Sequence, residues 1–222
     1  MNENYSHLED LTANKFLNLN YIRRYSNTRL LQEETDSQHT ITMQLLAMYF
    51  YDKYPKLPIR NITYRILVHD LDEAISGVKH GQQIFAFGDV PRGLKYYSND
   101  SYNLVRKATE KTMQDNIENE NIYLDITNAK YDFKTKQSSA ESAFVNILDS
   151  LEVLIKLRDE AYMQGGNSII MSHYENALEG YKEKLTSDFV EPYLQSGFWK
   201  GIYDECFQYY RDFKEEYYKL KR

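Results

Sequence analysis

The sequence has little of what cross-linked or membrane-spanning proteins need. Its 222 residues include one cysteine, Cys206, which excludes an intrachain disulfide framework and a cysteine-rich zinc module. The longest apolar run, at residues 45–51, is far shorter than the ~18 residues of a membrane-spanning helix. The N-terminal residues have neither the basic start nor the apolar core of a secretory signal. We therefore expect a cytoplasmic protein with no membrane partner.

An excess of positive charge is also absent. The net charge is −6, from 27 basic and 33 acidic residues, whereas proteins that coat nucleic acids or bind anionic membranes are normally basic. We therefore expect no nucleic acid polymer as a partner. A small anionic substrate is compatible with this charge, because one local basic pocket can hold it. The 42% of hydrophobic residues and 14% of aromatic residues exclude intrinsic disorder.

Helix-breaking residues are scarce, with nine glycines and four prolines in the chain. No Asn-Gly or Asp-Gly pair, the strongest short signal for a β-hairpin, occurs in the sequence. The long stretches between prolines predict an all-α fold, a bundle of about six to eight helices. We expect a single domain over residues 1–222, in which residues 186–222 form a C-terminal helical extension.

The spacing of apolar residues places the expected helices along the chain. They cover residues 5–19, 39–53, 59–70, 99–119, 137–165 and 168–185, and the last runs from 188 to the C-terminus. Residues 20–35 are predicted to connect the first two helices. Residues 71–97 contain four of the nine glycines, which makes them the best candidate for an active-site loop.

Three of these helices have a predicted packing face. For the helix at 39–53, Asp36 or Ser37 is the expected N-cap, and the predicted face carries Ile41, Leu45, Met48 and Tyr49. The next helix has an apolar stripe of Ile59, Ile62 and Ile66. The last helix has a heptad seam of Tyr203, Cys206, Tyr210, Phe213, Tyr217 and Leu220. This seam either docks on the protein's own domain or forms the contact of a homodimer.

Four ionisable side chains occupy positions where apolar ones are expected. His69 and Asp70 follow Ile66 by three and four residues, so both point toward the core side of their helix. They either cap the helix and touch solvent or bind a cation, because an unpartnered buried carboxylate is costly. Asp149 lies in the most apolar part of its helix, where it is either bonded to a tyrosine hydroxyl or a ligand.

His39 is the fourth, because its neighbours on the same helical face are apolar. Alone, it is either a hydrogen-bonded core histidine or a ligand. Together, two imidazoles and two carboxylates on three helices form a suitable donor set for one divalent transition metal, Zn, Mn, Co or Fe. Such an ion lowers the pKa of a bound water and polarises a phosphoryl group.

The order of these residues resembles that of the HD-domain metal-dependent phosphohydrolases, and more specifically of their bacterial 5′-deoxynucleotidase branch. The segments that carry the resemblance are Arg24-Tyr25, Asn27-Thr28-Arg29, Glu34, Ser37-Gln38-His39, His69-Asp70 with Glu73, Gly88-Asp89-Val90-Pro91, Leu94-Lys95-Tyr96 and Leu148-Asp149-Ser150-Leu151. The resemblance covers residues 20–185 and implies an HD-domain helical bundle.

The resemblance also implies roles for individual side chains. The implied metal ligands are His39, His69, Asp70 and Asp149. Glu73 would be the acid or base that protonates the leaving 5′-oxygen or positions the water, and Asp89 would act near the sugar. The implied substrate contacts are Arg24 and Lys95 to the phosphate and Tyr25 to the nucleoside. Arg24 suits the phosphate because its guanidinium is planar and always charged.

Three departures from the family pattern bear on specificity. An extra stretch around residues 78–87 separates Glu73 from Asp89. Tyr25 stands where the family has a tryptophan that helps to reject a 2′-hydroxyl, so the choice between deoxyribose and ribose stays open. Gln38 replaces the acid before the metal histidine, which changes the charge around the site.

The resemblance predicts hydrolysis of deoxynucleoside 5′-monophosphates to deoxynucleoside and phosphate. One alternative is a related enzyme that releases triphosphate from deoxynucleoside triphosphates. A second is hydrolysis of a hyperphosphorylated guanine alarmone, whose family shares the HD-x-x-E pattern. A third is a catalytically silent module that binds a nucleotide.

Overall fold

The structure is a computed structural model that describes residues 20, 24, 30–70, 78–79, 82–83, 139–188 and 190–221. These residues form six helices and one pair of two-residue strands, which confirms the predicted all-α class. The chain forms two compact units, Met1–Thr40 with Leu67–Asn128 and Ile41–Ile66 with Ala129–Arg222. The helices predicted at 5–19 and 99–119 lie outside the described residues.

Helix α3 spans Asp36–Lys53 and begins earlier than the sequence predicted. Its first turn is held by a reciprocal pair of hydrogen bonds. The Gln38 backbone N–H donates to Thr35 Oγ1 at 3.4 Å, and the Thr35 N–H donates to Gln38 Oε1 at 2.8 Å. This pattern is a capping box. The predicted N-cap, Asp36 or Ser37, was therefore wrong, because the box places the cap at Thr35.

The predicted packing face of α3 is also wrong. The four residues of that predicted face are between 45% and 61% exposed to solvent: Tyr49, Ile41, Met48 and Leu45. The helix instead buries Met43, Ala47 and Phe50. Because α3 is apolar on more than one side, residue spacing does not select a face. Packing selects it, since the Phe50 ring contacts the Phe144 ring edge to face at a centroid distance of 5.2 Å.

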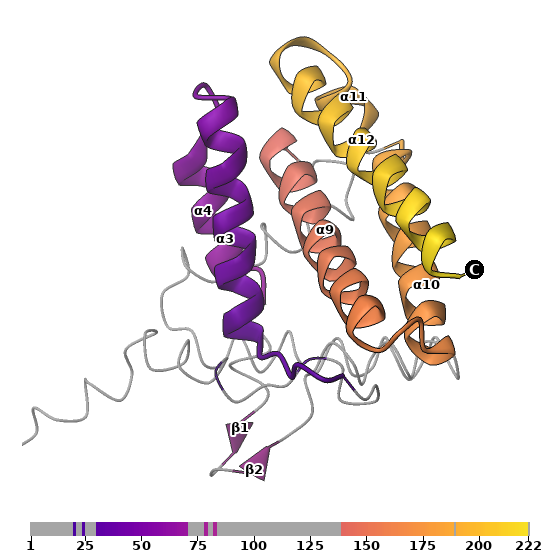
Figure 1. Cartoon of the computed structure of the whole chain (residues 1–222). Helices are drawn as coiled ribbons and strands as arrows, with labels where there is room; N and C mark the ends of the chain where they lie inside the picture. Colours follow the sequence, from indigo (N-terminus) through magenta and orange to yellow (C-terminus); the bar gives the residue numbers. More distant parts are fainter. Residues whose placement is uncertain are drawn as a thin grey trace, which may run out of the picture. The chain divides into compact units, whose positions relative to one another are not determined.

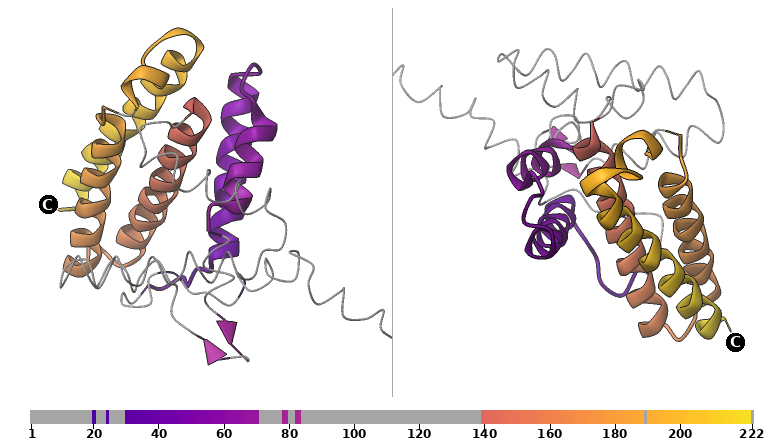
Figure 2. Two further views of the ribbon diagram at one scale, coloured as in Figure 1. Left: turned by 180° about the vertical axis from the view of Figure 1, so that it is seen from behind. Right: turned by 90° about the horizontal axis from the view of Figure 1, so that it is seen from above.

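Helix α4 spans Ile59–Val68 and follows the predicted pattern. Ile62 and Ile66 are fully buried, whereas Ile59 is partly exposed. Helices α3 and α4 lie side by side (Figures 1 and 2). The side-chain amide of Gln44 donates to the Thr63 carbonyl oxygen at 2.9 Å, which links the two helices.

The second unit also contains α9 (Ala140–Met163), α10 (Ser168–Leu185), α11 (Glu191–Leu194) and α12 (Gly197–Leu220). Figures 1 and 2 show α9, α10 and α12 lying side by side. Gly165 and Gly166, both at positive φ, form the turn from α9 to α10. The bounds of α10 match the prediction, whereas α12 begins later than predicted because the short α11 precedes it.

The heptad seam of α12 packs within its own chain. Cys206, Tyr210, Phe213 and Tyr217 are buried. Two buried hydroxyls of α10 donate to carbonyl oxygens of α12: Tyr181 to Cys206 at 3.0 Å and Tyr174 to Phe213 at 2.9 Å. Docking on its own domain is therefore the correct alternative for this seam. The homodimer stays a prediction, without support from these residues.

One feature was not predicted. Strands β1 (Val78–Lys79) and β2 (Gln82–Gln83) pair antiparallel, with Val78 opposite Gln83. Two-residue strands are too short to show the alternation from which strands are predicted. Within the described residues, no helix combines the length and the apolar character needed to cross a membrane.

Candidate metal centre

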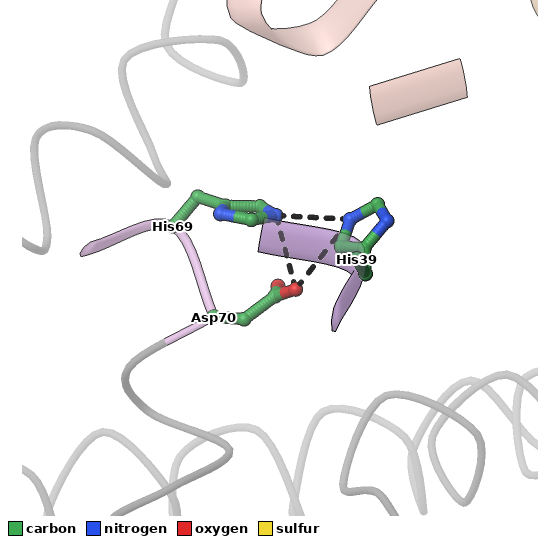
Figure 3. Close-up of side chains that lie close together, drawn as sticks. All are labelled: His39, His69 and Asp70. Carbon is green, nitrogen blue, oxygen red and sulfur yellow. Dashed lines mark hydrogen bonds and ion pairs between the residues drawn. The ribbon is translucent and has the colours of Figure 1, made fainter. Parts of the chain in front are cut away.

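Three ligand-type side chains of the first unit converge on one point (Figure 3). His39 lies in the first turns of α3, and His69 and Asp70 follow directly after the end of α4. The two Nε2 atoms of the histidines are 3.3 Å apart. Asp70 Oδ2 is 3.0 Å from His69 Nε2 and 3.9 Å from His39 Nε2. We refer to His39, His69 and Asp70 as the triad.

Local structure explains why these residues face one another. The capping box fixes the start of α3, so that His39 projects from a defined first turn and is fully buried. Helix α4 ends at Val68, which releases His69 and Asp70 from the helical path. Both keep only slight exposure to solvent. The sequence therefore placed the pair correctly near a helix end, although the helix is shorter than predicted.

The geometry of the triad fits one divalent ion. Two donors at about 2.1 Å from one metal, with an angle of about 90–110°, are about 3.0–3.4 Å apart. The separations of 3.3 Å between the two Nε2 atoms and 3.0 Å between His69 Nε2 and Asp70 Oδ2 lie in that range. The 3.9 Å between His39 Nε2 and Asp70 Oδ2 requires a wider angle at the metal. Two imidazoles and a carboxylate are also donors that Zn, Mn, Co and Fe accept. The triad can thus hold a divalent metal.

The charge of the triad favours the same conclusion. Burial by itself raises the pKa of Asp70, but His69, His39 and Arg24 lower it by more. The pKa of this carboxyl therefore lies well below its ordinary value, and Asp70 is an anion at neutral pH. An anionic oxygen between two imidazole nitrogens is ready to bind a cation without first losing a proton.

Arg24 joins the triad to two further acids. Its Nη1 atom is 3.6 Å from Asp70 Oδ2 and also 3.6 Å from Asp36 Oδ1, and its Nε atom is 3.8 Å from Glu34 Oε2. The role of Arg24 at the phosphate stays a prediction. From the sequence, Asp36 was expected only as an N-cap. Its position three residues before His39, on the same face of α3, could have indicated that Asp36 lies near the metal site.

Asp149 lies in the second unit, on α9, and its surroundings differ from those expected. Its side chain is 27% exposed, and its Oδ2 atom accepts a hydrogen bond from Lys184 Nζ at 3.1 Å. Asp149 is therefore only partly buried, and Lys184 is one of its partners. Lys184 comes from α10, and helical spacing within α9 gives no information on it. The role of Asp149 as a fourth metal ligand stays a prediction.

The other predicted site residues lie outside the described part of the chain. They are Tyr25, Glu73, Asp89 and Lys95. Their roles at the nucleoside, the leaving oxygen, the sugar and the phosphate therefore stay predictions.

Comparisons with known proteins identify the family of this chain. Residues 13–196 match the family described as 5′-deoxynucleotidase YfbR-like. A crystal structure of an HD-domain phosphohydrolase from Listeria innocua is similar in fold, with a TM-score of 0.55 and 16% sequence identity, over 90% of this chain and 99% of that one. No curated protein matches the sequence. The family match spans most of the chain and includes the triad, and the protein therefore belongs to the 5′-deoxynucleotidase YfbR-like family of hydrolases.

Proposed function

We propose that this hydrolase removes the 5′-phosphate from deoxynucleoside 5′-monophosphates. Water would attack phosphorus, the bond from phosphorus to the 5′-oxygen would break, and that oxygen would leave with a proton as the free deoxynucleoside. The observation that carries the proposal is the convergence of the triad's Nε2 and Oδ2 atoms in a chain of this family. The triad would hold one divalent ion, with Asp149 as a further ligand.

The roles of the chain's own residues follow from their chemistry. A bound divalent ion supplies Lewis acidity toward the phosphoryl oxygens and the attacking water. Asp70 would contribute negative charge, and His39 and His69 would contribute Nε2 donor atoms. Glu73 would donate the proton to the 5′-oxygen, since a positioned acid contributes about 10²–10⁴-fold to a rate.

The remaining predicted residues would define the substrate. Lys95 and Arg24 would balance the phosphate charge, Asp89 would act near the sugar, and Tyr25 would contact the nucleoside. Because Tyr25 stands where the family has a tryptophan, the ribonucleotides are tested beside the deoxyribonucleotides.

The charges around the triad favour a monophosphate over a triphosphate. Arg24 is shared among three carboxylates, those of Glu34, Asp36 and Asp70. Two additional phosphate groups near this cluster would meet like charge, which weakens binding. A single phosphate brings less negative charge to the cluster, and the metal ion, Arg24 and Lys95 would together balance it. We therefore expect the triphosphohydrolase alternative to fail.

Product analysis tests the proposal. The protein is incubated with each deoxynucleoside mono- and triphosphate and with the ribonucleotides, in the presence of Mn²⁺, Co²⁺, Zn²⁺ or Fe²⁺. Deoxynucleoside and orthophosphate from the monophosphates, with the triphosphates inert, is the expected result. Release of intact triphosphate would replace the proposal by the triphosphohydrolase. Binding without turnover of any nucleotide would support the silent module.

Two substitutions connect activity to the triad. Asp70→Ala is expected to abolish phosphate release and to lower the bound metal, while the helical circular dichroism signal is retained. Asp52 is an exposed aspartate on the same helix as His39. Asp52→Asn is therefore the matched control, and it should leave phosphate release and bound metal unchanged. Full activity and unchanged metal content in Asp70→Ala would remove the triad from the mechanism.

Three accompanying expectations are independent of this chemistry. We propose a homodimer, a single domain over residues 1–222 and a cytoplasmic location, as the sequence suggested. Light scattering after size exclusion determines the oligomeric state, and cell fractionation determines the compartment. A monomeric active enzyme would leave the proposed reaction intact.

A further inference from the structure

Asp36 has a buried carboxylate beside the triad that the proposed function does not use. Its side chain is 1% exposed, and its Oδ1 atom is 3.6 Å from Arg24 Nη1. The same nitrogen is 3.6 Å from Oδ2 of Asp70. Asp36 and His39 are three residues apart on α3, so they lie on one face of the helix. Asp36 and Asp70 thus approach the same nitrogen of Arg24, which links Asp36 to the triad.

The start of the helix does not explain this carboxylate. Thr35 and Gln38 form the capping box, and Asp36 takes part in the first turn through its carbonyl oxygen, which accepts a hydrogen bond from Thr40 Oγ1 at 2.8 Å. A buried aspartate that served neither a cap nor a charge partner would destabilise the protein. The Arg24 guanidinium that Asp36 faces is a charge partner for this buried carboxylate.

The guanidinium creates an electrostatic difficulty for cation binding. Arg24 Nη1 approaches Asp70 Oδ2, which is the same oxygen that faces both imidazoles of the triad. A fixed positive charge at that distance opposes the binding of a divalent cation, and it does so more strongly in a buried site. The negative charge of Asp36, which approaches the same Nη1 atom, reduces this opposition.

We propose that Asp36 is a positioning residue that holds the Arg24 guanidinium and offsets its charge, so that Asp70 Oδ2 can bind a divalent cation. Glu34, at 3.8 Å from Arg24 Nε, supports the same arrangement from a second side. The inference rests on the proposed function only in taking the triad as the metal site.

Mn²⁺ affinity of the metal-depleted full-length protein, measured by titration calorimetry without nucleotide, tests the inference. Asp36→Asn is expected to bind Mn²⁺ about 10–100-fold more weakly, a range typical of changes outside the ligand shell, because the charge of Arg24 beside Asp70 would no longer be offset. Asp36→Glu, which keeps the charge, should recover most of the affinity. Asp52→Asn is the control for removing one negative charge from the same helix, and it should bind Mn²⁺ normally.

A second substitution separates this role from a structural one. If Asp36 acts through Arg24, removing both charges in Asp36→Asn/Arg24→Gln should restore Mn²⁺ affinity to within a few-fold of the unmodified protein. Damage to the fold would not be repaired by a second buried substitution. Arg24→Gln alone should bind Mn²⁺ at least as tightly as the unmodified protein, and this variant decides the question if Asp36→Asn does not fold.

Three results would overturn the inference. They are unchanged Mn²⁺ affinity in folded Asp36→Asn, tenfold weaker binding in Arg24→Gln, and no Mn²⁺ binding by the unmodified protein. The proposed reaction fails separately, through inactivity toward every monophosphate. Dependence of Mn²⁺ affinity on Asp36 in a protein that hydrolyses no monophosphate would support the inference and reject the reaction.

Discussion

Glu205 on α12 accepts hydrogen bonds from three side chains, two of which come from the C-terminal end of α3 and the residue after it. The donors are Lys53 Nζ at 2.6 Å, Tyr209 OH at 2.7 Å and Tyr54 OH at 3.0 Å. Replacing Glu205 by glutamine keeps the shape of the side chain and removes its charge. We predict that this substitution lowers the free energy of unfolding by about 2 kcal/mol.

The magnitude follows from the surroundings of each donor. A hydrogen bond to a charged group contributes about 1.5–3 kcal/mol, but an exposed ion pair contributes about 0–1 kcal/mol. Lys53 is 42% exposed and therefore adds little. The two tyrosine hydroxyls are partly buried, and glutamine retains one oxygen that can accept from one of them. The net loss is thus about one charge-assisted hydrogen bond.

Urea unfolding followed by circular dichroism measures this effect, and Asp204→Asn is the matched control. Asp204 is adjacent in the sequence and pairs with Lys200 at 2.7 Å, but its side chain is 55% exposed against 17% for Glu205. We expect the control to lose less than about 0.5 kcal/mol. Equal losses in the two variants would show that burial of the acceptor is not what gives Glu205 its effect.

The effect of Glu205 should also depend on pH. Burial raises the pKa of Glu205, but the hydrogen bonds from Lys53, Tyr209 and Tyr54 lower it by more, so its pKa in the folded protein is below the ordinary value. A carboxyl with a lowered folded-state pKa stabilises the protein fully when the pH is above its unfolded-state pKa of about 4.3. It loses this contribution as the pH falls from that value through the folded-state pKa. The difference between the unmodified protein and Glu205→Gln should therefore be constant from about pH 6 to 8 and shrink below about pH 4.

Three further predictions concern the described helices. Thr35→Ala removes one half of the capping box and should cost about 1 kcal/mol in urea unfolding, whereas an unchanged midpoint would mean that the box is not formed in solution. Tyr181→Phe removes a buried hydrogen bond to the Cys206 carbonyl and should cost about 1 kcal/mol, with no change in Mn²⁺ affinity. Burial raises the pKa of the Cys206 thiol, so Ellman's reagent should react with it only after unfolding, and rapid reaction of the native protein would contradict its burial.

The sequence by itself determined the fold class and the members of the triad. Scarce glycine and proline give long helices because little interrupts the backbone hydrogen bonds, and α10 begins and ends where its spacing predicts. In α4, Ile62 and Ile66 share a single apolar stripe, so the pattern allows one buried face. His39 and the His69-Asp70 pair were identified from the sequence because their order in the chain resembles the order of the family's metal ligands.

Tertiary structure decided what residue spacing leaves undetermined. Helix α3 is apolar on several sides, and contact with Phe144 rather than periodicity determines that Phe50 is buried while Leu45 is exposed. Lys184 reaches Asp149 from another helix, 35 residues along the chain. Arg24 likewise comes close to Asp36 and Asp70 only when the chain is folded, because these residues are separated in the sequence. The physical reason is the same in each case. Burial and charge pairing depend on distances between residues in space, whereas residue spacing within one helix shows only which residues of that helix are neighbours.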